Sequence, residues 1–414
     1  MQRLLAILIF FLASAAISQD GEARLDTFFE RTDSNHDAKI SAAELEAVGQ
    51  RSAWLNRADT DEDGLASREE VLAFFGRRSE PPSKEGKERA EINVIRTESI
   101  PENSEVSLAG IEAAEAYSAA EEGHSFFVMI GGEVVRESYA GDWDRSKGHR
   151  LASGTKSFSG AILALGVKDG LLQPEERVSE TIEEWKENEA LRDITIRDLL
   201  NLTSGIDPGD NGRVPPYATA TQVKSLGAVG ERFRYGPNAF QIFGELVTRK
   251  LAAREDLPFP DPLAYLEARI FEPIGLHVSE WRRDRDGKPH LPSGAFLTAP
   301  EWAKYGQLLL KDGVWEGESL LDKATLAEAT RPISAVMPGY GLTFWLLDGN
   351  GAETRPWLQG GYMAAGAGKQ RLFVLPAAEL VVVRQGESRN FDNLEFLEAL
   401  FSIEEGVDSS NVQG

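Results

Sequence analysis

The sequence predicts an α+β domain with an antiparallel sheet flanked by helices, preceded by a small all-α module that carries two calcium-binding loops. Strand-like segments near residues 125–138 and 370–384 enclose a long helical and loop-rich stretch, so one sheet is expected to use both ends of the domain. Two acidic loops lie close together before residue 78. A polar, proline-bearing stretch then separates the two regions.

The composition is that of a globular protein with an acidic surface. The chain has 414 residues, which is enough for two or three domains, and a formal net charge of −23. This charge argues against nucleic acid and anionic membranes as partners, and it suits the binding of cations. The chain has no cysteine, so disulfide bonds, thiolate metal sites and acylation of a cysteine are excluded.

The first 18 residues are predicted to be a signal peptide. Arg3 gives a positive start, residues 4–17 are apolar, and Ala16 and Ser18 are small residues suited to cleavage. A membrane anchor is the alternative, but the apolar run is short for a span and acidic residues follow it directly. We therefore expect export to the periplasm or the medium, with no stable membrane span later in the chain.

Residues 33–44 fit the calcium loop of an EF-hand. The spacing places side-chain oxygens at loop positions one, three, five and twelve, and a backbone carbonyl at position seven. The expected ligands are Asp33, Asn35, Asp37, the carbonyl of Lys39, and Glu44. Position six holds Ala38 where glycine is usual, so this residue has to adopt a positive φ at some energetic cost.

A second loop, residues 59–70, has every ligand position filled. Its expected ligands are Asp59, Asp61, Asp63, the carbonyl of Leu65, and Glu70. Two loops in tandem with apolar flanks predict an EF-hand pair over residues 19–78; the alternative is a solvated acidic helical hairpin. Extracellular calcium modules bind at about 10⁻⁴–10⁻³ M, so we expect Ca²⁺ to be a structural ion here.

Residues 79–104 are assigned to a linker, because Ser79 to Glu88 is polar, charged and contains prolines. The domain then extends over residues 105–402, followed by an acidic, polar tail at residues 403–414 that is expected to be disordered. Within the domain, the pattern predicts a helix over Leu108–Glu121. Runs of β-branched and aromatic residues predict two hairpins, over residues 125–138 and 370–384.

Ser153 and Lys156 are the strongest candidates for catalysis. Because they are three residues apart, they share one face of a helix. A serine hydroxyl needs a base within hydrogen-bond reach, and a lysine can be that base when burial lowers its pKa towards neutrality. No other serine in the chain has a lysine three residues later. S-x-x-K alone is a weak signal, so the flanking sequence has to decide.

The flanking segment Leu151–Leu163, LASGTKSFSGAIL, resembles the nucleophile helix of the serine β-lactamase and penicillin-binding-protein superfamily, in its class C and esterase-like branch. Residues 194–206, 271–276 and 306–313 are also similar to segments of this family, in the same order. The resemblance implies a β-lactamase-like domain with one sheet built from both chain ends and a helical insert. It also implies an active site between them, in which Ser153 is acylated.

The second motif of the family, Y-x-N, is incomplete in this chain. Tyr235 matches the tyrosine, and the resemblance makes it a base or relay for the Ser153 proton, helped by Lys156. Two residues later stands Pro237, and Asn238 follows one position too late. The usual contact of the asparagine with a substrate amide is therefore in doubt. A core tyrosine with a satisfied hydroxyl is the alternative for Tyr235.

The third motif, K-T-G or H-x-G in relatives, lacks its lysine or histidine. The corresponding segment, residues 360–370, consists mainly of glycine and alanine. An oxyanion hole needs only backbone N–H groups, and the resemblance places these at Ser153 and Ala367. Lys369 in the same segment either lines the cleft or is a solvated lysine in a turn.

These departures favour an ester or amide substrate without an obligatory carboxylate, because β-lactamases hold that group with the missing lysine-threonine-glycine strand. We expect an exported serine hydrolase, most similar to carboxylesterases, that acts on a small molecule through Ser153, Lys156 and Tyr235 without a catalytic cofactor. One alternative is a catalytically weak module that binds peptide or cell-wall fragments. Another is a β-lactamase or D,D-peptidase in which Lys369 replaces the motif lysine. The sequence does not predict the oligomeric state.

Overall fold

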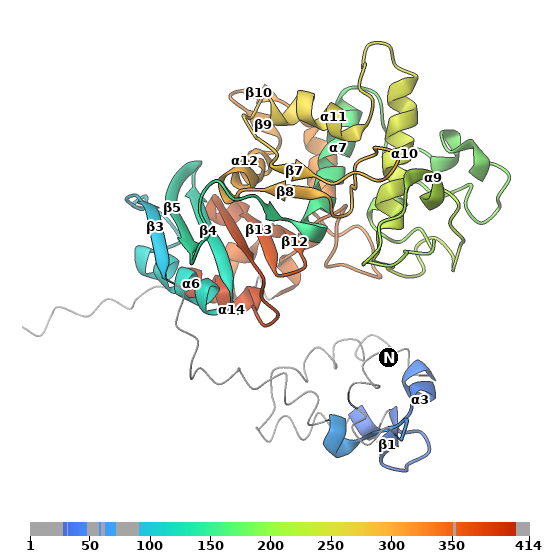
Figure 1. The fold of residues 1–414 in the computed structure, drawn as a ribbon, viewed down its shortest axis with the longest axis horizontal. Helices are drawn as coiled ribbons and strands as arrows, with labels where there is room; N and C mark the ends of the chain where they lie inside the picture. The colour runs from blue at the N-terminus through green and yellow to red at the C-terminus, as the bar shows by residue number, and fades with distance from the viewer. Residues whose placement is uncertain are drawn as a thin grey trace, which may run out of the picture. The chain divides into compact units, whose positions relative to one another are not determined.

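The computed structural model describes residues 28–30, 32–47, 58, 63–71, 91–350 and 353–402 (Figure 1). The chain divides into two compact units, residues 1–88 and residues 89–414. The predicted signal peptide and the predicted polar tail lie outside the described residues. Among the residues that the structure describes, no helix has the length and apolar character needed to cross a membrane.

In the first unit, a two-stranded antiparallel sheet joins the two predicted calcium loops. Strand β1 (Lys39–Ile40) pairs with β2 (Ala66–Ser67), and helix α3 (Ala42–Ala47) follows β1. Ile40 and Ala66 lie opposite each other and are fully buried. The two loop segments are therefore held together by backbone pairing above an apolar core.

The second unit is built on a seven-stranded antiparallel sheet with the order β11-β12-β13-β14-β4-β5-β3 (Figure 1). Strands from the two ends of the domain meet in its middle, where β14 pairs with β4 and Val382 lies opposite Val128. The predicted α+β architecture with an antiparallel sheet is confirmed. The strands are β3 (Ile92–Thr97), β4 (Gly123–Ile130), β5 (Glu133–Ala140), β11 (Trp345–Leu346), β12 (Tyr362–Gly366), β13 (Gln370–Leu375) and β14 (Leu380–Gly386).

Alternate residues of the sheet face two separate cores, as the two-residue repeat of a strand requires. In β4, Phe126 contacts one core and Phe127 the other. Helices α6 (Leu108–Ala120) and α14 (Asn393–Leu400) pack on the first face, where the ring of Phe396 meets that of Phe126 edge-on. This face carries no predicted catalytic residue, so the site belongs to the opposite side.

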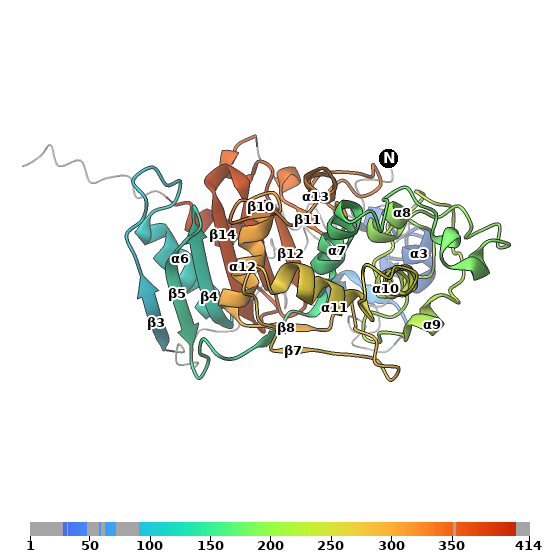
Figure 2. The ribbon, with the colours of Figure 1, turned by 90° about the horizontal axis from the view of Figure 1, so that it is seen from above.

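The helical part of the unit lies on the opposite face (Figure 2). Its central helix, α7 (Ser157–Lys168), is buried over its first ten residues and continues directly from the short 3₁₀ helix η4 (Ala152–Lys156). The other helices here are η5 (Val178–Glu180), η6 (Glu183–Trp185), α8 (Ile196–Leu200), α9 (Tyr217–Ala220), α10 (Asn238–Ala252), α11 (Pro262–Leu266), the π-helical η7 (Glu267–Phe271), α12 (Ala299–Leu310) and α13 (Lys323–Ala329). Near the C-terminal strands are three more 3₁₀ turns, η8 (Asp348–Asn350), η9 (Pro356–Leu358) and η10 (Pro376–Ala378).

Two small sheets complete the second unit. Strands β6 (His149–Arg150), β8 (Ala295–Leu297) and β7 (Glu280–Trp281) form a three-stranded antiparallel sheet in that order. Strands β9 (Val314–Trp315) and β10 (Glu318–Ser319) form a hairpin. Because only Leu151 lies between β6 and η4, the three-stranded sheet fixes the start of the segment that contains Ser153.

The linker predicted over residues 79–104 extends too far towards the C-terminus. Residues 92–97 form β3, which pairs with β5 at the edge of the large sheet. Ile92, Val94 and Ile95 are β-branched and favour a strand even though the preceding sequence is polar. The second compact unit accordingly begins at residue 89.

Removing β3 is expected to destabilise the second unit. A protein that begins at residue 105 leaves the backbone groups of β5 unpaired at the sheet edge, whereas one that begins at residue 89 keeps them paired. We expect the shorter protein to melt at least about 5 °C lower in thermal unfolding followed by circular dichroism. Equal melting temperatures would show that β3 adds nothing to the stability of the sheet.

Candidate functional site

A 3₁₀ helix places the two predicted catalytic residues side by side. In η4, side chains three residues apart lie directly above one another. The distance from Lys156 Nζ to Ser153 Oγ is 3.2 Å, which is within hydrogen-bond range. Ser153 is half-buried, whereas Lys156 is only 3% exposed. The pair therefore combines a reachable hydroxyl with a buried amine.

The residue before the serine, Ala152, has a backbone conformation that L-amino acids avoid. Its φ is 48°, in the left-handed region. Its carbonyl accepts a hydrogen bond from Thr155 Oγ1 at 2.7 Å, and the amide of Leu151 donates to Ala295 O at 3.0 Å. Such strain persists where surrounding contacts hold it, and it is frequent at functional sites. Here the positive φ of Ala152 turns the backbone between β6 and Ser153.

Lys156 lies in surroundings that disfavour its charged form. Burial lowers the pKa of its amine from the ordinary value of 10.5 to about 7. Its Nζ donates to the carbonyl of Pro292 at 3.1 Å and lies 5.2 Å from the ring centre of Phe240. Near neutral pH much of the amine is therefore neutral and has a lone pair for the proton of Ser153. The contacts of Lys156 with Pro292 and Phe240 were not indicated by the sequence motif.

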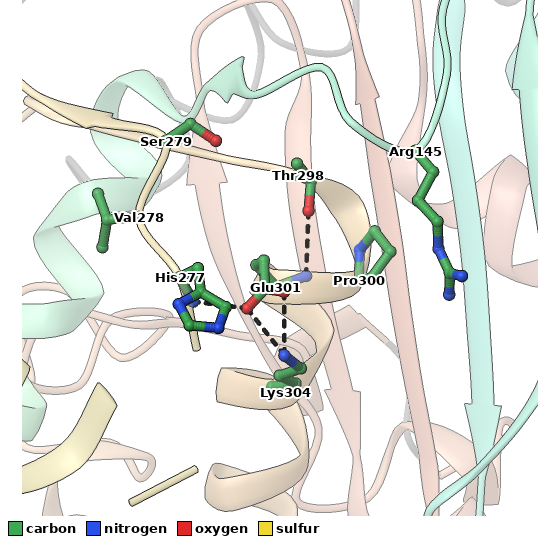
Figure 3. Close-up of a pocket in the computed structure, with 8 residues that line it drawn as sticks. All are labelled: Arg145, His277, Val278, Ser279, Thr298, Pro300, Glu301 and Lys304. Atoms are coloured by element: carbon green, nitrogen blue, oxygen red, sulfur yellow. Dashed lines mark hydrogen bonds and ion pairs between the residues drawn. The ribbon is translucent and has the colours of Figure 1, made fainter. Parts of the chain in front are cut away.

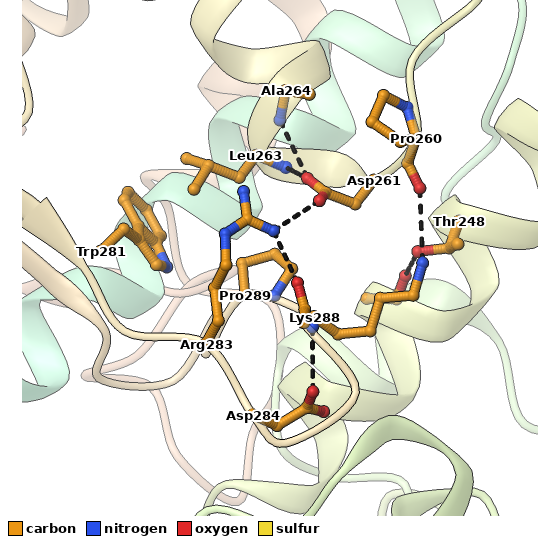
Figure 4. Close-up of polar contacts among 12 residues, drawn as sticks. Thr248, Pro260, Asp261, Leu263, Ala264, Trp281, Arg283, Asp284, Lys288 and Pro289 are labelled. Atoms are coloured by element: carbon orange, nitrogen blue, oxygen red, sulfur yellow. Dashed lines mark hydrogen bonds and ion pairs between the residues drawn. The ribbon is translucent and has the colours of Figure 1, made fainter.

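The loop that presents the Pro292 carbonyl is anchored by side chains of the helical region. Tyr217 donates its hydroxyl hydrogen to Pro289 O at 3.0 Å. Arg283, on the same loop, donates to Asp261 Oδ2 at 2.6 Å, and Asp261 in turn caps α11 (Figure 4). The acceptor for Lys156 is thus held by a braced loop.

Tyr235 reaches the same place from the loop before α10. Its ring centre lies 4.8 Å from Lys156 Nζ. Burial raises the pKa of Tyr235, while the side chain of Ser153 and the positive charge of Arg371 act in the opposite direction. Ser153, Lys156 and Tyr235 together are named the serine cluster below. The structure brings these three predicted residues together.

Aromatic rings surround Tyr235 on its other side. The ring centres of Phe233, Tyr340 and Trp345 lie 6.2, 6.5 and 5.8 Å from that of Tyr235. Phe233 and Trp345 remain partly exposed, as Tyr235 does. They give the serine cluster an apolar wall that excludes water from one side.

The displaced asparagine of the second motif does not point to the serine cluster. Asn238 is the first residue of α10, and its Nδ2 donates to the carbonyl of Asp207 at 3.0 Å. Pro237, which stands at the asparagine position, is buried and has no polar side-chain group. The substrate side of the site therefore lacks the amide that the complete motif would supply.

Strand β12 lies against the backbone of η4. A Cβ atom on Gly366, the last residue of β12, would be 2.0 Å from the carbonyl oxygen of Leu151 and 3.1 Å from the amide nitrogen of Gly154. Only glycine allows this approach. Ala367 follows directly, in the turn after β12, and within the described residues its amide donates no hydrogen bond to the protein. The predicted oxyanion donor thus adjoins the segment that holds Ser153.

Lys369, the alternative to the missing motif lysine, occupies the tip of this turn with a φ of 62°. Burial lowers the pKa of its amine, and the charges that act on it are those of Arg371, Asp392, Arg384 and Glu121. None of these groups belongs to the serine cluster. The position of Lys369 gives little support to a role as the substrate-carboxylate holder.

In the first predicted calcium loop, the acidic side chains accept backbone hydrogen bonds. Asp33 accepts from the amides of Asp37 and Ala38 at 3.2 and 2.8 Å, and Glu44 accepts from the amide of Ser41 at 2.9 Å. Hydrogen bonds from Ser41 and Ser34 lower the pKa of Glu44 to about 2. Ala38 has a φ of 63°, the positive value that a sixth-position residue needs. Calcium binding by residues 33–44 stays a prediction.

The second loop is described only in part, because Asp59 and Asp61 lie outside the described residues. Asp63 accepts from the amide of Leu65 at 2.9 Å and pairs with Lys39 of the first loop. Glu70 is buried and accepts from the amide of Ser67 at 2.9 Å. Counting only the described residues, no group of three or more aspartate, glutamate or histidine side chains is placed to hold a metal ion.

A separate pocket of about 340 Å³ lies beside the N-terminal end of α12 (Figure 3). Two of its charged groups pair, since Glu301 accepts from Lys304 Nζ at 2.9 Å, and Glu301 also accepts from the backbone amide of His277 at 2.7 Å. No member of the serine cluster lines it. Its lining consists of Arg145, His277, Val278, Ser279, Thr298, Pro300, Glu301 and Lys304. The serine cluster, rather than this pocket, is the candidate active site.

Comparison with known families finds one match, which lies within the second unit. The model of the family described as Beta-lactamase matches residues 110–389, more than half of the chain and all three members of the serine cluster. No curated protein matches the sequence significantly.

Several solved structures share the fold of this chain. One is provisionally named a 6-aminohexanoate-dimer hydrolase, from Bacillus anthracis, with 18% identity and a TM-score of 0.57 over 76% of this chain and 90% of that one. Another is EstCE1, a hydrolase with promiscuous acyltransferase activity, with 17% identity and a TM-score of 0.58 over 71% of this chain and 99% of that one. A family VIII carboxylesterase has 17% identity and a TM-score of 0.55 over 75% of this chain and 99% of that one. At these identities the likeness shows the fold alone.

Replacing the buried amine with an apolar chain of similar length is expected to stabilise the protein. The pKa of Lys156 is lower in the folded state than in the unfolded state, so its burial costs most below pH 7, and the cost declines as the pH rises from 7 to 10.5. Lys156→Met should raise the free energy of unfolding by about 1–3 kcal/mol at pH 6, and by less at pH 9, in urea unfolding. Lys168→Met, at the exposed end of α7, is the control and should show no such gain. No gain for Lys156→Met at pH 6 would contradict the argument from burial.

Proposed function

The chain belongs to the beta-lactamase family of serine hydrolases, and we propose that it hydrolyses esters or amides, carboxylic esters above all, through an acyl-enzyme on Ser153. The observation that carries this proposal is the buried amine of Lys156, which lies 3.2 Å from the Ser153 hydroxyl and has no carboxylate beside it in the described part of the chain. The fold that this chain shares with hydrolases of esters and of amides supports both substrate classes.

In the acylation step, Ser153 Oγ attacks the carbonyl carbon of the substrate and its proton passes to the neutral amine of Lys156. The new C–O bond turns the carbonyl oxygen into an oxyanion, to which the amides of Ser153 and Ala367 would donate hydrogen bonds. Tyr235 gives its proton to the leaving alcohol or amine as that bond breaks, and it recovers a proton from Lys156. The acyl group is then held as an ester of Ser153.

In the deacylation step, a water molecule attacks the acyl carbonyl and loses a proton to the Tyr235–Lys156 pair. The bond from the acyl carbon to Ser153 Oγ breaks, the serine recovers its proton, and a carboxylic acid is released. Both steps use only groups of the serine cluster and backbone amides, so the chemistry requires no cofactor. Because the base must be neutral, turnover should rise as the pH passes the Lys156 pKa of about 7.

The substrate is proposed to lack an obligatory carboxylate. Residues 362–366 of β12, which runs beside the serine, carry no charged side chain. Pro237 replaces the amide of the second motif, and the charges nearest Lys369 belong to groups outside the cluster. The partly exposed rings of Phe233 and Trp345 offer apolar surface instead. These features favour neutral esters over β-lactams.

Ser153→Ala is expected to abolish turnover of a short-acyl p-nitrophenyl ester, and Tyr235→Phe to lower kcat by roughly 10²–10⁴-fold, because each removes a group that handles the reacting proton. Ser146→Ala, an exposed serine outside the cluster, is the matched control and should retain full turnover. A chromogenic cephalosporin should be cleaved far more slowly than the ester. Fast cephalosporin cleavage would favour a β-lactamase, and no Ser153-dependent turnover of esters, amides or cephalosporin would favour a binding module.

We also propose that the first unit binds Ca²⁺ as a structural ion and that the protein is exported, as its predicted signal peptide suggests. The positive φ of Ala38 and the antiparallel pairing of β1 with β2 support paired calcium loops. Asp33, Asn35, Asp37, the Lys39 carbonyl and Glu44 would hold one ion, and the corresponding residues of the loop at 59–70 the other. Bound calcium would neutralise the acidic side chains and fix the two loops against each other.

Glu44→Gln and Glu70→Gln are each expected to remove one calcium site, because position twelve supplies both oxygens of a carboxylate. Isothermal titration with calcium chloride should give two sites for the wild type and one for each variant, and ester turnover should not change. Glu69→Gln removes an exposed carboxylate next to Glu70 and should leave both sites intact. Equal losses for Glu69→Gln and Glu70→Gln would indicate diffuse attraction by acidic residues instead of a built loop.

A further inference from the structure

The turn between β12 and β13 is held by three buried side chains that bind its carbonyl groups. Four successive carbonyl oxygens, from residue 366 to residue 369, each accept a hydrogen bond from one of these side chains. The bonds run from Arg371 Nη1 to Gly366 O (3.2 Å), from Gln370 Nε2 to Ala367 O (3.2 Å), and from Arg384 Nη1 to Gly368 O and Lys369 O (both 3.0 Å). The backbone of this turn has therefore little freedom to rotate.

Two of the three side chains are cations that form no ion pair with a carboxylate among the described residues, although the charges of Asp392 and Glu121 act on them from beyond ion-pair distance. Arg371 is 7% exposed and Arg384 is fully buried. Their described hydrogen bonds all go to carbonyl oxygens or to the side chain of Asn393, whereas Arg136, which is equally buried in the same sheet, pairs with the Glu115 carboxylate. Burying a cation without a counter-charge costs several kcal/mol.

A charged side chain is not required to hold the carbonyl groups of a turn. Gln370, a neutral amide, holds one carbonyl of the same turn. Burial lowers the pKa of Arg371 to about 10 and that of Arg384 to about 9, so both remain charged at neutral pH. Two permanent positive charges thus lie next to the turn that adjoins Ser153, in surroundings where water screens them little.

The bond from Arg371 acts on one particular peptide group. The carbonyl of Gly366 and the N–H of Ala367 belong to the same trans peptide, so they point in opposite directions. A guanidinium on the carbonyl oxygen fixes the orientation of that N–H, and it also polarises the peptide so that the N–H becomes a stronger donor. The N–H of Ala367 donates no hydrogen bond within the described part of the protein.

We propose that Arg371 is a positioning residue of the oxyanion hole: it orients and polarises the peptide between Gly366 and Ala367, so that the Ala367 amide donates to the oxyanion formed on attack by Ser153. Arg384 and Gln370 hold the remainder of the turn. The inference rests on the proposed function, because the oxyanion exists only if Ser153 attacks a carbonyl group.

The test compares an ester with its thionoester, in which sulfur replaces the carbonyl oxygen and accepts hydrogen bonds poorly. Arg371→Gln should lower kcat/KM for the ester by roughly 10- to 100-fold, mainly through kcat, and lower that for the thionoester much less. The ester-to-thionoester ratio therefore falls. Arg371→Lys keeps a charged donor and should give an intermediate ratio. Titration of active sites with the ester burst corrects each value for the folded fraction.

Arg136→Gln is the matched control. It removes a buried arginine from the same sheet, so it should lower the melting temperature and leave the ester-to-thionoester ratio unchanged. Equal losses on both substrates for Arg371→Gln would overturn the positioning role. Should Arg371→Gln not fold, Arg371→Lys decides, because an unchanged ratio overturns the role and a lower ratio supports it. A wild type without Ser153-dependent turnover would remove the proposed function, and the positioning role with it.

Discussion

The chemistry of this site depends on the removal of water from one amine. Lys156 has the Pro292 carbonyl and two aromatic rings around it, and no carboxylate of the described residues is near enough to stabilise its charge. A lysine in water would keep its proton and could not accept one from Ser153. The central helix, the braced loop of Pro292 and the aromatic wall all contribute to its burial. The fold thus converts an ordinary ammonium group into a base.

Burial has the opposite consequence for the neighbouring arginines. A guanidinium starts from a much higher pKa, so Arg371 and Arg384 stay charged in surroundings that neutralise Lys156. Ser153 therefore has a proton acceptor in Lys156, whereas the turn at the end of β12 lies beside two arginines that stay positively charged. The glycine contact between β12 and η4 keeps these two parts in register, because a side chain at Gly366 would push them apart. The base acts on the Ser153 hydroxyl, and the positive field acts on the backbone of the turn beside it.

Local patterns predicted the parts of the molecule that local forces determine. The helix from Leu108, both hairpins and the Ser153–Lys156 spacing follow from interactions within a few residues. The Pro292 acceptor could not be predicted, because it is a backbone atom 136 residues after Lys156. Strand β3 was not predicted because most of its residues are exposed at the sheet edge, and the polar sequence before it is typical of a linker. Arg371 binds backbone atoms, and such a partner leaves no motif in a sequence.

The pairing of β14 with β4 also constrains how the chain can be made. The two strands are separated by residues 131–379, so the middle of the sheet stays open until nearly all of the polypeptide has been synthesised. Until then the long apolar edge of β4 is exposed, in a state prone to aggregation. The first unit has no such dependence, since its paired loops are close in sequence. Biogenesis is therefore expected to be sequential, with a slow final step set by closure of the large sheet.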